Sequence, residues 1–589
     1  MSRRPNVVFV LTDDQGYGEI GAHGNAWIRT PNMDKLHDEG VRFTHYHVGT
    51  TCAPTRSGLM TGHHCNSAGV WHTIGGRSLL RPDEWTLADA LKSAGYRTGH
   101  FGKWHLGDCK PFRPHDRGFE ETVYHCGGGV GNTADAWGND YFDDTYQVNG
   151  TPQKFEGYCT DVFFREGMKF IEAHKDEPFF CYIATNAPHG PFNVEPEYMN
   201  LYTDTAPHEN RARFYGMVTN IDENLGKLRA KLDELGLTDN TIVMFMTDNG
   251  SGGGNTPDRE TSYVEEGPCQ FNDGMRGTKG SEYEGGHRVP WFLHWPTGHL
   301  TGGRSIERLA SYVDFMPTIL DLCGVTVPAE RNFQGRSLKP LLAGDAPDAD
   351  WTQRILVTDT QRLARPIKWR RSCVMQDKWR LINGTELYDM EADWGQRNDI
   401  AAEHPGKIAE LRAGYEAWWT TVSEQFDRDI PCELGADEET VTLTTHDIRN
   451  EAANTAWNQG HVRRGHVCSG YWEVNFARAG RYEFAMQRWP RDAGHALGAG
   501  IDGDDVEWRK DAIAKNETSK YSGGVALDLR WATIEAFGKT QWAEVDADAT
   551  QLTFEMDLPA GETHLFAGFC DAYQTIAPYF IYVRYLGAS

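Results

Sequence analysis

The segment from Cys52 to Arg56 brings together a nucleophile, a helix start and a fixed positive charge. Pro54 suits the first turn of a helix, where its missing N–H costs nothing. A helix that begins here would place the Cys52 side chain at its positive end, with Arg56 one turn further on. This combination suits an anionic, tetrahedral group that is rich in oxygen. On its own, the segment is better explained by a buried cysteine beside a surface arginine, since cysteine is among the most buried residue types.

Two apolar runs lead into carboxylate and amide side chains. Each run is continuous, which is typical of a strand buried on both faces of a parallel sheet. The side chains are Asp13 and Asp14 after residues 7–11, and Asp248 and Asn249 after residues 241–246. Because open α/β sheets bind ligands at the carboxyl ends of their strands, this pattern predicts a metal site there. The alternative for Asp13 and Asp14 is a solvated turn, which is common.

Lysine and histidine side chains recur in turns that are rich in glycine and proline. They are Lys103 and His105 within residues 102–107, His189 within residues 185–191, and Lys279 within residues 276–280. Taken singly, a histidine is usually structural and a lysine is usually solvated. The formal net charge is −26, so a site for an anion needs a local group of cations against the field of the whole protein.

Length and composition exclude several classes of function. A chain of 589 residues is too long for one hydrophobic core, and its acidic balance disfavours nucleic acid and anionic membranes as partners. No apolar run approaches the ~20 residues of a membrane span. The 12 cysteines include no C-x-x-C pair, so most are expected to be reduced and buried. The short run after Arg3 and Arg4 lacks a cleavage site, which favours a cytoplasmic protein, although a chain trimmed of a leader for the periplasm or for secretion would look the same.

The order of the predicted elements divides the chain into three parts. Residues 1–350 combine buried strands with amphipathic helices. Residues 351–435 are expected to form a small antiparallel sheet closed by a helix near residues 405–420. Residues 440–589 alternate apolar and polar positions between glycine and aspartate turns, which predicts a β-rich sandwich. The predicted strands of the first two parts are residues 7–11, 96–101, 178–184, 241–246, 291–295, 372–375, 379–382 and 386–389.

The segment 127–149 is rich in Gly, Asn and Asp. Such a composition is typical of turns, so we expect a long surface excursion rather than a core element. Loops of this kind often shape the entrance for a substrate.

Six motifs occur together in one order. They are D-D at residues 13–14, C-x-P-x-R at 52–56, G-K-W-H at 102–105, A-P-H at 187–189, D-N-G at 248–250, and R-G-x-K with E-G-G-x-R-V-P between 276 and 290. With these motifs, the sequence resembles the formylglycine-dependent sulfatases, which are arylsulfatase-like members of the alkaline-phosphatase-like superfamily. The one minor departure is Thr55, where many members carry Ser. The resemblance implies an alkaline-phosphatase-like α/β fold, with a central mixed, mostly parallel sheet flanked by helices. The small antiparallel-sheet subdomain would follow this core, and the C-terminal β-rich domain lies outside the family pattern.

The resemblance also implies a reaction. A formylglycine-generating enzyme would oxidise Cys52 to formylglycine, an aldehyde that hydrates to a geminal diol. One hydroxyl would attack the sulfur of a sulfate monoester, and the second would release sulfate from a hemiacetal sulfate intermediate. Asp13, Asp14, Asp248 and Asn249, with the modified Cys52, would hold Ca²⁺, with Mg²⁺ or Mn²⁺ as alternatives. The expected substrate is an anionic sulfate ester of an aryl or carbohydrate alcohol.

The same resemblance assigns roles to the charged side chains. Asp248 would be the base that activates the attacking hydroxyl. The groups that would hold the sulfate oxygens and offset their charge are Arg56, Lys103 and Lys279. His189, helped by Lys279, would protonate the leaving oxygen, and His105 would take the proton that triggers release.

Two other functions fit the sequence. One is a phosphonate monoester or phosphodiester hydrolase of the same fold, because these monoanions match sulfate esters in shape and charge. The other is a non-catalytic relative that binds sulfated glycans through the β-rich domain. Trp457, Trp489 and Trp508 could be exposed aromatics in such a module, although core packing is the more common use of tryptophan.

Overall fold

A computed structural model describes residues 4–253, 271–344, 348–571 and 574–588. The largest sheet has ten strands in the order β11-β2-β10-β9-β1-β8-β4-β5-β6-β7. Its five central strands, from β9 to β5, are parallel, and antiparallel pairings join them to β10 and β6. The bounds are β1 Asn6–Thr12, β2 Val41–Phe43, β4 Arg97–Gly102, β5 Glu121–Tyr124, β6 Thr145–Val148, β7 Thr151–Lys154, β8 Phe179–Ala184, β9 Thr241–Thr247, β10 Trp291–His294 and β11 Arg304–Ile306. The predicted mixed, mostly parallel sheet is confirmed.

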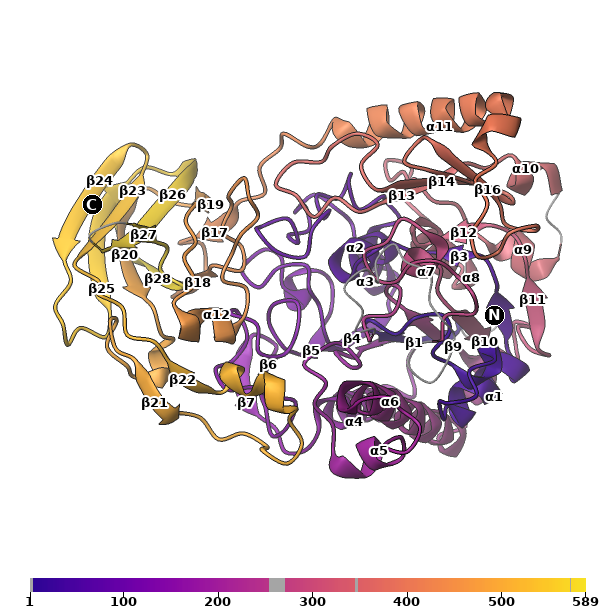
Figure 1. The fold of residues 1–589 in the computed structure, drawn as a ribbon, viewed down its shortest axis with the longest axis horizontal. Helices are drawn as coiled ribbons and strands as arrows, with labels where there is room; N and C mark the ends of the chain where they lie inside the picture. Colours follow the sequence, from indigo (N-terminus) through magenta and orange to yellow (C-terminus); the bar gives the residue numbers. More distant parts are fainter. Residues whose placement is uncertain (1–3, 254–270, 345–347, 572–573, 589) are drawn as a thin grey trace.

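Helices cover both faces of this sheet, and each face has its own hydrophobic core (Figure 1). Alternate residues of β1 enter the two cores, with Val7, Phe9 and Leu11 on one face and Val8 and Val10 on the other. This double burial explains the continuous apolar runs in the sequence. The first core packs against α2 Cys52–Thr61, α3 Leu87–Ser93 and α8 Phe315–Leu322, and the second against α1 Pro31–Glu39, α4 Cys159–Ala173 and α6 Glu209–Glu234.

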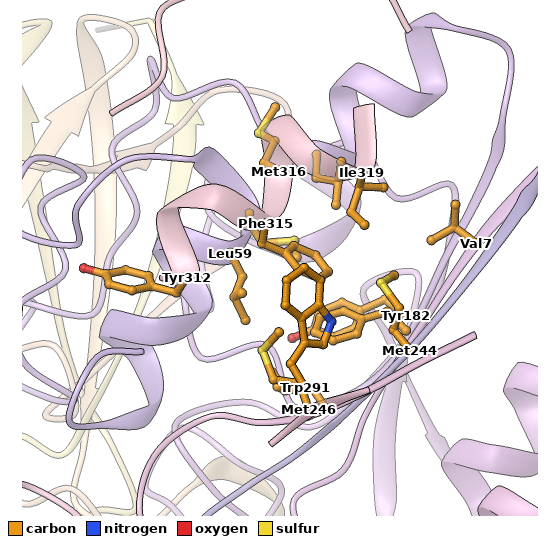
Figure 2. Close-up of a cluster of buried hydrophobic side chains, with 14 of the residues drawn as sticks. Val7, Leu59, Tyr182, Met244, Met246, Trp291, Tyr312, Phe315, Met316 and Ile319 are labelled. Carbon is orange, nitrogen blue, oxygen red and sulfur yellow. The ribbon is translucent and has the colours of Figure 1, made fainter. Parts of the chain in front are cut away.

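The first core is drawn from distant parts of the chain. Figure 2 shows Leu59 of α2 and Phe315 of α8 beside Trp291 of β10 and Met246 of β9. Phe9 of β1 also lies 4.5 Å, between ring centroids, from Phe315. This packing fixes α2, and with it Cys52, over the central strands.

A four-stranded antiparallel sheet follows along the chain, and one helix packs against it. The strands are β13 Leu356–Asp359, β14 Ser372–Gln376, β15 Trp379–Ile382 and β16 Glu386–Asp389, and the helix is α11 Pro405–Ser423. The predicted small antiparallel sheet and its helix are confirmed, although β13 was not predicted.

The C-terminal region has two sheets around one hydrophobic core, shown in orange and yellow in Figure 1. The first has the order β17-β19-β26-β23-β24 with β27 beside β26, and the second has the order β18-β28-β20-β25. The bounds are β17 Cys432–Leu434, β18 Val441–Thr444, β19 Tyr471–Phe476, β20 Gly480–Gln487, β23 Trp531–Ala536, β24 Lys539–Glu544, β25 Leu552–Leu558, β26 Gly561–Cys570, β27 Thr575–Ile576 and β28 Phe580–Gly587. Two sheets that face each other across one core form a sandwich. The division of the chain at residues 350 and 440 stays a prediction.

The segment 127–149 is not the surface excursion that its composition suggested. Most of it is buried, and it includes β6. Its polar side chains bond the buried backbone; Asp144 accepts from the N–H groups of Asp140 and Tyr141, for example. Further along, Trp137 of the segment packs against Trp489 of the C-terminal sandwich, 5.8 Å between ring centroids. The prediction was wrong because Asn and Asp can satisfy a buried loop as well as an exposed turn.

The remaining elements are short. They are α5 Pro196–Asn200, α7 Glu284–His287, α9 Lys339–Ala343, α10 Asp348–Thr352, α12 Gln459–Arg464, β3 Tyr46–His47, β12 Ala310–Ser311, β21 Ile501–Asp504 and β22 Ser522–Gly524. Among the residues that the structure describes, no helix is both long and apolar enough to span a membrane. The described cysteines are unpaired and most are buried, and Cys269 lies outside the described residues.

Candidate active site

The carboxyl ends of β1 and β9 bring three carboxylates together. Thr12 and Thr247 are partners in the parallel register, so the residues that follow them, Asp13 and Asp248, lie side by side. Asp14 has a φ of 68°, and its N–H donates to Asp248 Oδ1 at 3.1 Å. All three carboxylates are buried. Burial and the neighbouring Asp13 raise the pKa of Asp248 to about 7, which reflects the cost of these charges in one place.

Cys52 is the first residue of α2, as the sequence predicted, and only 2% of it is exposed. Its sulfur and oxygens of Asp13 and Asp248 all lie within 4.8 Å of one another. Burial raises the pKa of the Cys52 thiol, although Lys103 and Lys279 act in the opposite direction. An unmodified thiol would therefore be protonated here and a weak nucleophile.

Each carboxylate has its own cation. Lys103 Nζ lies 2.5 Å from Asp13 Oδ2, and Lys279 Nζ lies 2.5 Å from Asp14 Oδ1. Arg56 donates to Asp248 Oδ2 from Nε at 3.1 Å and from Nη2 at 2.8 Å. We call the eight residues of this arrangement the strand-end cluster; they are Asp13, Asp14, Cys52, Arg56, Lys103, Asp248, Asn249 and Lys279.

Two oxygen atoms of the strand-end cluster are buried without a donor. In the described part of the chain, Asp13 Oδ1 and Asn249 Oδ1 have no hydrogen-bond partner. The amide of Asn249 is held by its Nδ2, which donates to Asp14 Oδ1 and to Gly250 O, both at 2.9 Å. Buried polar atoms normally find a partner, so two such oxygens beside Cys52 and Asp248 fit a bound cation. Carboxylate and amide oxygens are the ligands that Ca²⁺ and Mg²⁺ prefer.

Both predicted catalytic histidines are near the strand-end cluster. His189 Nε2 lies 3.7 Å from Asp14 Oδ2, and its Nδ1 is 2.6 Å from Gly190 O. His105 Nε2 lies 2.8 Å from Thr73 O, and a Cβ on Gly128 would come within 2.4 Å of its ring. Burial lowers the pKa of His189 to about 3 and that of His105 well below 6.5, so both rings are neutral at neutral pH.

A cavity of about 260 Å³ opens over Cys52. Its lining includes Cys52 and three further predicted site residues, His105, His189 and Lys279. It also includes Trp457, which the sequence offered as an exposed aromatic, and Gly128 and Asn132 of the segment 127–149. The lining residues that the sequence did not point to are His72, Thr73, Ile74 and Arg362. Among these lining residues there is no carboxylate, so the cavity favours an anion. Arg56 and Lys103 are not part of the lining; both are buried and are bonded to Asp248 and Asp13.

Comparison with known proteins agrees with this geometry. The sulfatase family model matches residues 5–325, and a model described as N-sulphoglucosamine sulphohydrolase, C-terminal, matches residues 278–413. The chain belongs to the sulfatase family. All eight residues of the strand-end cluster, from Asp13 to Lys279, lie within the first match.

Relatives and solved structures match part of the chain. Human N-acetylgalactosamine-6-sulfatase is 31% identical over 362 residues, which are 57% of this chain and 66% of that protein. The arylsulfatase of Hemicentrotus pulcherrimus is 32% identical over 366 residues, 58% of this chain and 62% of that protein. Thus the chain spans slightly less than two thirds of these relatives. The structure of Ps i-CgsB with k-i-k-neocarrahexaose has a TM-score of 0.62 and 26% identity, and covers 71% of this chain and 93% of that one.

Proposed function

We propose that this protein hydrolyses sulfate monoesters, with formylglycine at position 52 as the nucleophile. One observation carries the proposal. Cys52 lies at the N-terminus of α2, within 4.8 Å of the Asp13 and Asp248 oxygens, at the floor of a cavity that has cations but no carboxylate in its lining. The helix end and the cations favour an anionic ester at this place.

Formylglycine supplies a hydrated aldehyde, of which one hydroxyl can attack sulfur and the other can release sulfate by C–O cleavage. This chemistry explains why a plain thiol is not sufficient, since a thiol has no second hydroxyl with which to release the product. Sulfated carbohydrates are the proposed substrates, because the Ps i-CgsB structure contains an oligosaccharide and a further neighbour is described in complex with D-glucosamine-2-N,6-O-disulfate.

A divalent cation, with Ca²⁺ as the first choice, would be held by Asp13, Asp14, Asp248, Asn249 and the modified side chain at position 52. When bound, it supplies positive charge that stabilises an oxygen nucleophile. The two donor-free oxygens, Asp13 Oδ1 and Asn249 Oδ1, are the part of the structure that fits such an ion.

The side chains of the cavity have distinct tasks in this proposal. Lys279 faces the cavity and binds a sulfate oxygen. The negative charge of a bound sulfate ester would raise the pKa of His189, because it favours the imidazolium form, so that His189 can protonate the leaving oxygen. His105, neutral without substrate, takes the proton that accompanies release of sulfate. Arg56 and Lys103 hold Asp248 and Asp13 in place, and direct contact of these two cations with sulfate stays a prediction. Asp248 accepts the proton of the attacking hydroxyl.

Two measurements test the proposal. Conversion of the Cys52 thiol to an aldehyde lowers the mass of its peptide by about 18 Da, a change that no ordinary cysteine oxidation gives. Protein purified after expression with a formylglycine-generating enzyme should show this loss and should hydrolyse 4-nitrophenyl sulfate. A kcat/KM for an aryl phosphonate monoester that exceeds the sulfate value by orders of magnitude would instead assign the protein to phosphonate hydrolysis.

A further inference from the structure

The cavity over Cys52 has a wall that comes from the C-terminal region. Trp457 lines it, although this residue lies more than a hundred positions beyond the 5–325 match to the sulfatase model. Trp457 is 37% exposed, whereas Cys52, which also lines the cavity, is 2% exposed. The cavity therefore runs from a buried anion site to a large aromatic side chain at its mouth.

The backbone around Trp457 is fixed to the catalytic region. Trp457 O accepts a hydrogen bond from Thr133 N at 3.0 Å, and Gln459 N donates to Gly131 O at 3.0 Å. Asn132 and Asn458 form an antiparallel bridge between these two bonds. The Trp457 ring touches His461 edge-on, with the centroids 5.2 Å apart and the planes at 74°. A rigid backbone and a partly open ring leave the aromatic available for a ligand.

The volume of the cavity exceeds the needs of a sulfate group. Its 260 Å³ equal the share of about nine water molecules in the liquid. The anion belongs at the Cys52 end, where Lys279 and His189 lie. The rest of the substrate, which is the alcohol that leaves, must then extend toward Trp457 and Arg362. A flat indole offers apolar contact area with little conformational entropy to lose.

We propose that Trp457 contacts the leaving alcohol and determines specificity for alcohols that present a ring, so that the C-terminal sandwich contributes a wall of the active site. This inference rests on the proposed sulfatase function. It differs from a lectin-like role for the sandwich, because Trp457 would act inside the catalytic cavity and not at a separate glycan site. The arrangement also explains why the segment 127–149 is buried: it joins Trp457 to Gly128 and His105.

The test compares ligands with and without the ring. Inorganic sulfate reports the anion site alone, and 4-nitrophenyl sulfate adds a ring. For Trp457→Ala we expect KM for 4-nitrophenyl sulfate to rise roughly tenfold with kcat little changed, since the contact is made in the ground state and the transition state alike. The Kd of inorganic sulfate, measured by calorimetry, should stay within twofold of the wild-type value. Trp457→Phe, which keeps a ring, should recover most of the KM.

The matched control is Trp542→Ala. Trp542 belongs to the same sandwich, is 63% exposed and lies on β24, away from the cavity, so its loss should change none of these constants. Thermal unfolding of each variant shows whether it is folded. An unchanged KM in Trp457→Ala would overturn the inference, and so would an equal weakening of inorganic sulfate, because that would indicate a general structural role.

Failure of the proposed function gives a different result. If wild-type protein that carries formylglycine does not hydrolyse 4-nitrophenyl sulfate, the proposed reaction is wrong. The role of Trp457 is then decided by calorimetry with the ester as ligand. Tighter binding of the ester than of inorganic sulfate, lost in Trp457→Ala, would support the contact; equal binding of the two ligands would reject it.

Discussion

In the described part of the chain, a group of possible metal ligands formed by Asp108, His446 and Asp447 is only partly buried, whereas two clusters with such groups are buried throughout. One is the strand-end cluster. The other, which we call the His47–Glu284 cluster, consists of His47, Glu284, His287, Arg288 and Arg380. In each cluster, three potential ligand atoms lie within 4.8 Å of one another. Residue types and distances alone therefore do not distinguish them.

The distribution of charge distinguishes the two clusters. The strand-end cluster has three carboxylates and three cations, with two donor-free oxygens and a cavity above it. The His47–Glu284 cluster has one carboxylate, whose Oε1 accepts from Arg380 Nε at 2.5 Å. Its Oε2 also has no hydrogen-bond donor among the described residues, but this oxygen lies 3.7 Å from Arg288 Nη1. Its two histidines bond each other, Nδ1 to Nδ1, at 2.9 Å. A divalent cation would meet two guanidinium groups there, so this cluster is structural.

The short helix that carries Glu284 and His287 also packs against the strand-end cluster. Gly286 O accepts a hydrogen bond from Gly250 N at 3.0 Å, and a Cβ on Gly250 would lie 2.0 Å from Gly285 O. The short helix α7 thus holds the turn that carries Asp248 and Asn249. The comparison predicts that changes in the strand-end cluster affect activity first, and that changes in the His47–Glu284 cluster affect stability first.

The largest effect is expected for Asp13→Asn. This change removes a proposed metal ligand and the charged partner of Lys103, so kcat/KM for 4-nitrophenyl sulfate should fall on the order of 10³-fold. The bound metal, measured by emission spectrometry, should fall with it. Asp437→Asn is a matched control, because this exposed aspartate pairs with Lys110 on the surface. Wild-type activity together with wild-type metal content in Asp13→Asn would contradict the assignment.

Glu284→Gln should instead lower the stability of the protein and leave its activity almost unchanged. Loss of the carboxylate leaves Arg380 buried without its counter-charge, and breaking such a pair costs about 3–5 kcal/mol of unfolding free energy. Well below the melting temperature, kcat/KM should stay within roughly threefold of wild type, since the glutamine can still bond Arg380. Glu416→Gln, which breaks an exposed pair with Lys368, should cost about 0–1 kcal/mol. Urea titrations give both free energies, and a Glu284→Gln variant that is stable but inactive would reverse the comparison.

The two clusters were not equally visible in the sequence. Asp13 and Asp248 could be placed together because the carboxyl ends of parallel strands meet at one edge of a sheet, and Pro54 indicated the helix that presents Cys52. His47 gave no signal, since its partners Glu284 and Arg380 are more than two hundred residues away. The fold of the core and the β-rich C-terminal region could be predicted from periodicity and motifs.

The position of Trp457 in the fold could not be predicted from sequence periodicity. The sequence offered it as a candidate exposed aromatic but did not place it, because its position depends on the contact between residues 456–459 and the segment 131–138. The composition of this segment predicted a loop, and a loop prediction does not indicate which other parts of the chain pack against it. Trp489, considered together with Trp457 in the sequence, is buried in the sandwich core.

Acid should weaken the protein through its buried neutral histidines, and His287 gives the His47–Glu284 cluster a share in this effect. Burial lowers the pKa of His287 to about 4. A histidine with a lowered folded pKa contributes stability above its ordinary value of 6.5, and this stability is lost as the pH falls from 6.5 to about 4, which amounts to about 3 kcal/mol. Burial opposes the charge of Glu284, but Arg380 holds its pKa well below 4.5, so its contribution is lost only at lower pH still.

The check is a series of urea titrations between pH 7 and pH 4. His287→Asn should flatten the decline relative to wild type, whereas a surface change, His564→Asn, should leave the slope as it is. Equal slopes for His287→Asn and wild type would show that His287 does not stay neutral in the folded protein.

The smallest expected effect is that of bound metal on the stability of the protein, and it distinguishes the two clusters most directly. Because an ion that binds only the folded state stabilises it by mass action, Ca²⁺ at a hundredfold excess over its Kd should add about 2.7 kcal/mol. Chelation with EGTA should lower the melting temperature, and added Ca²⁺ should restore it. Asp13→Asn should abolish this response, since it alters the donor-free oxygen, whereas Glu284→Gln should melt earlier and keep the full response. A Ca²⁺ response that survives Asp13→Asn but disappears in Glu284→Gln would place the metal in the His47–Glu284 cluster. The distribution of charge would then not distinguish a metal site from a structural cluster.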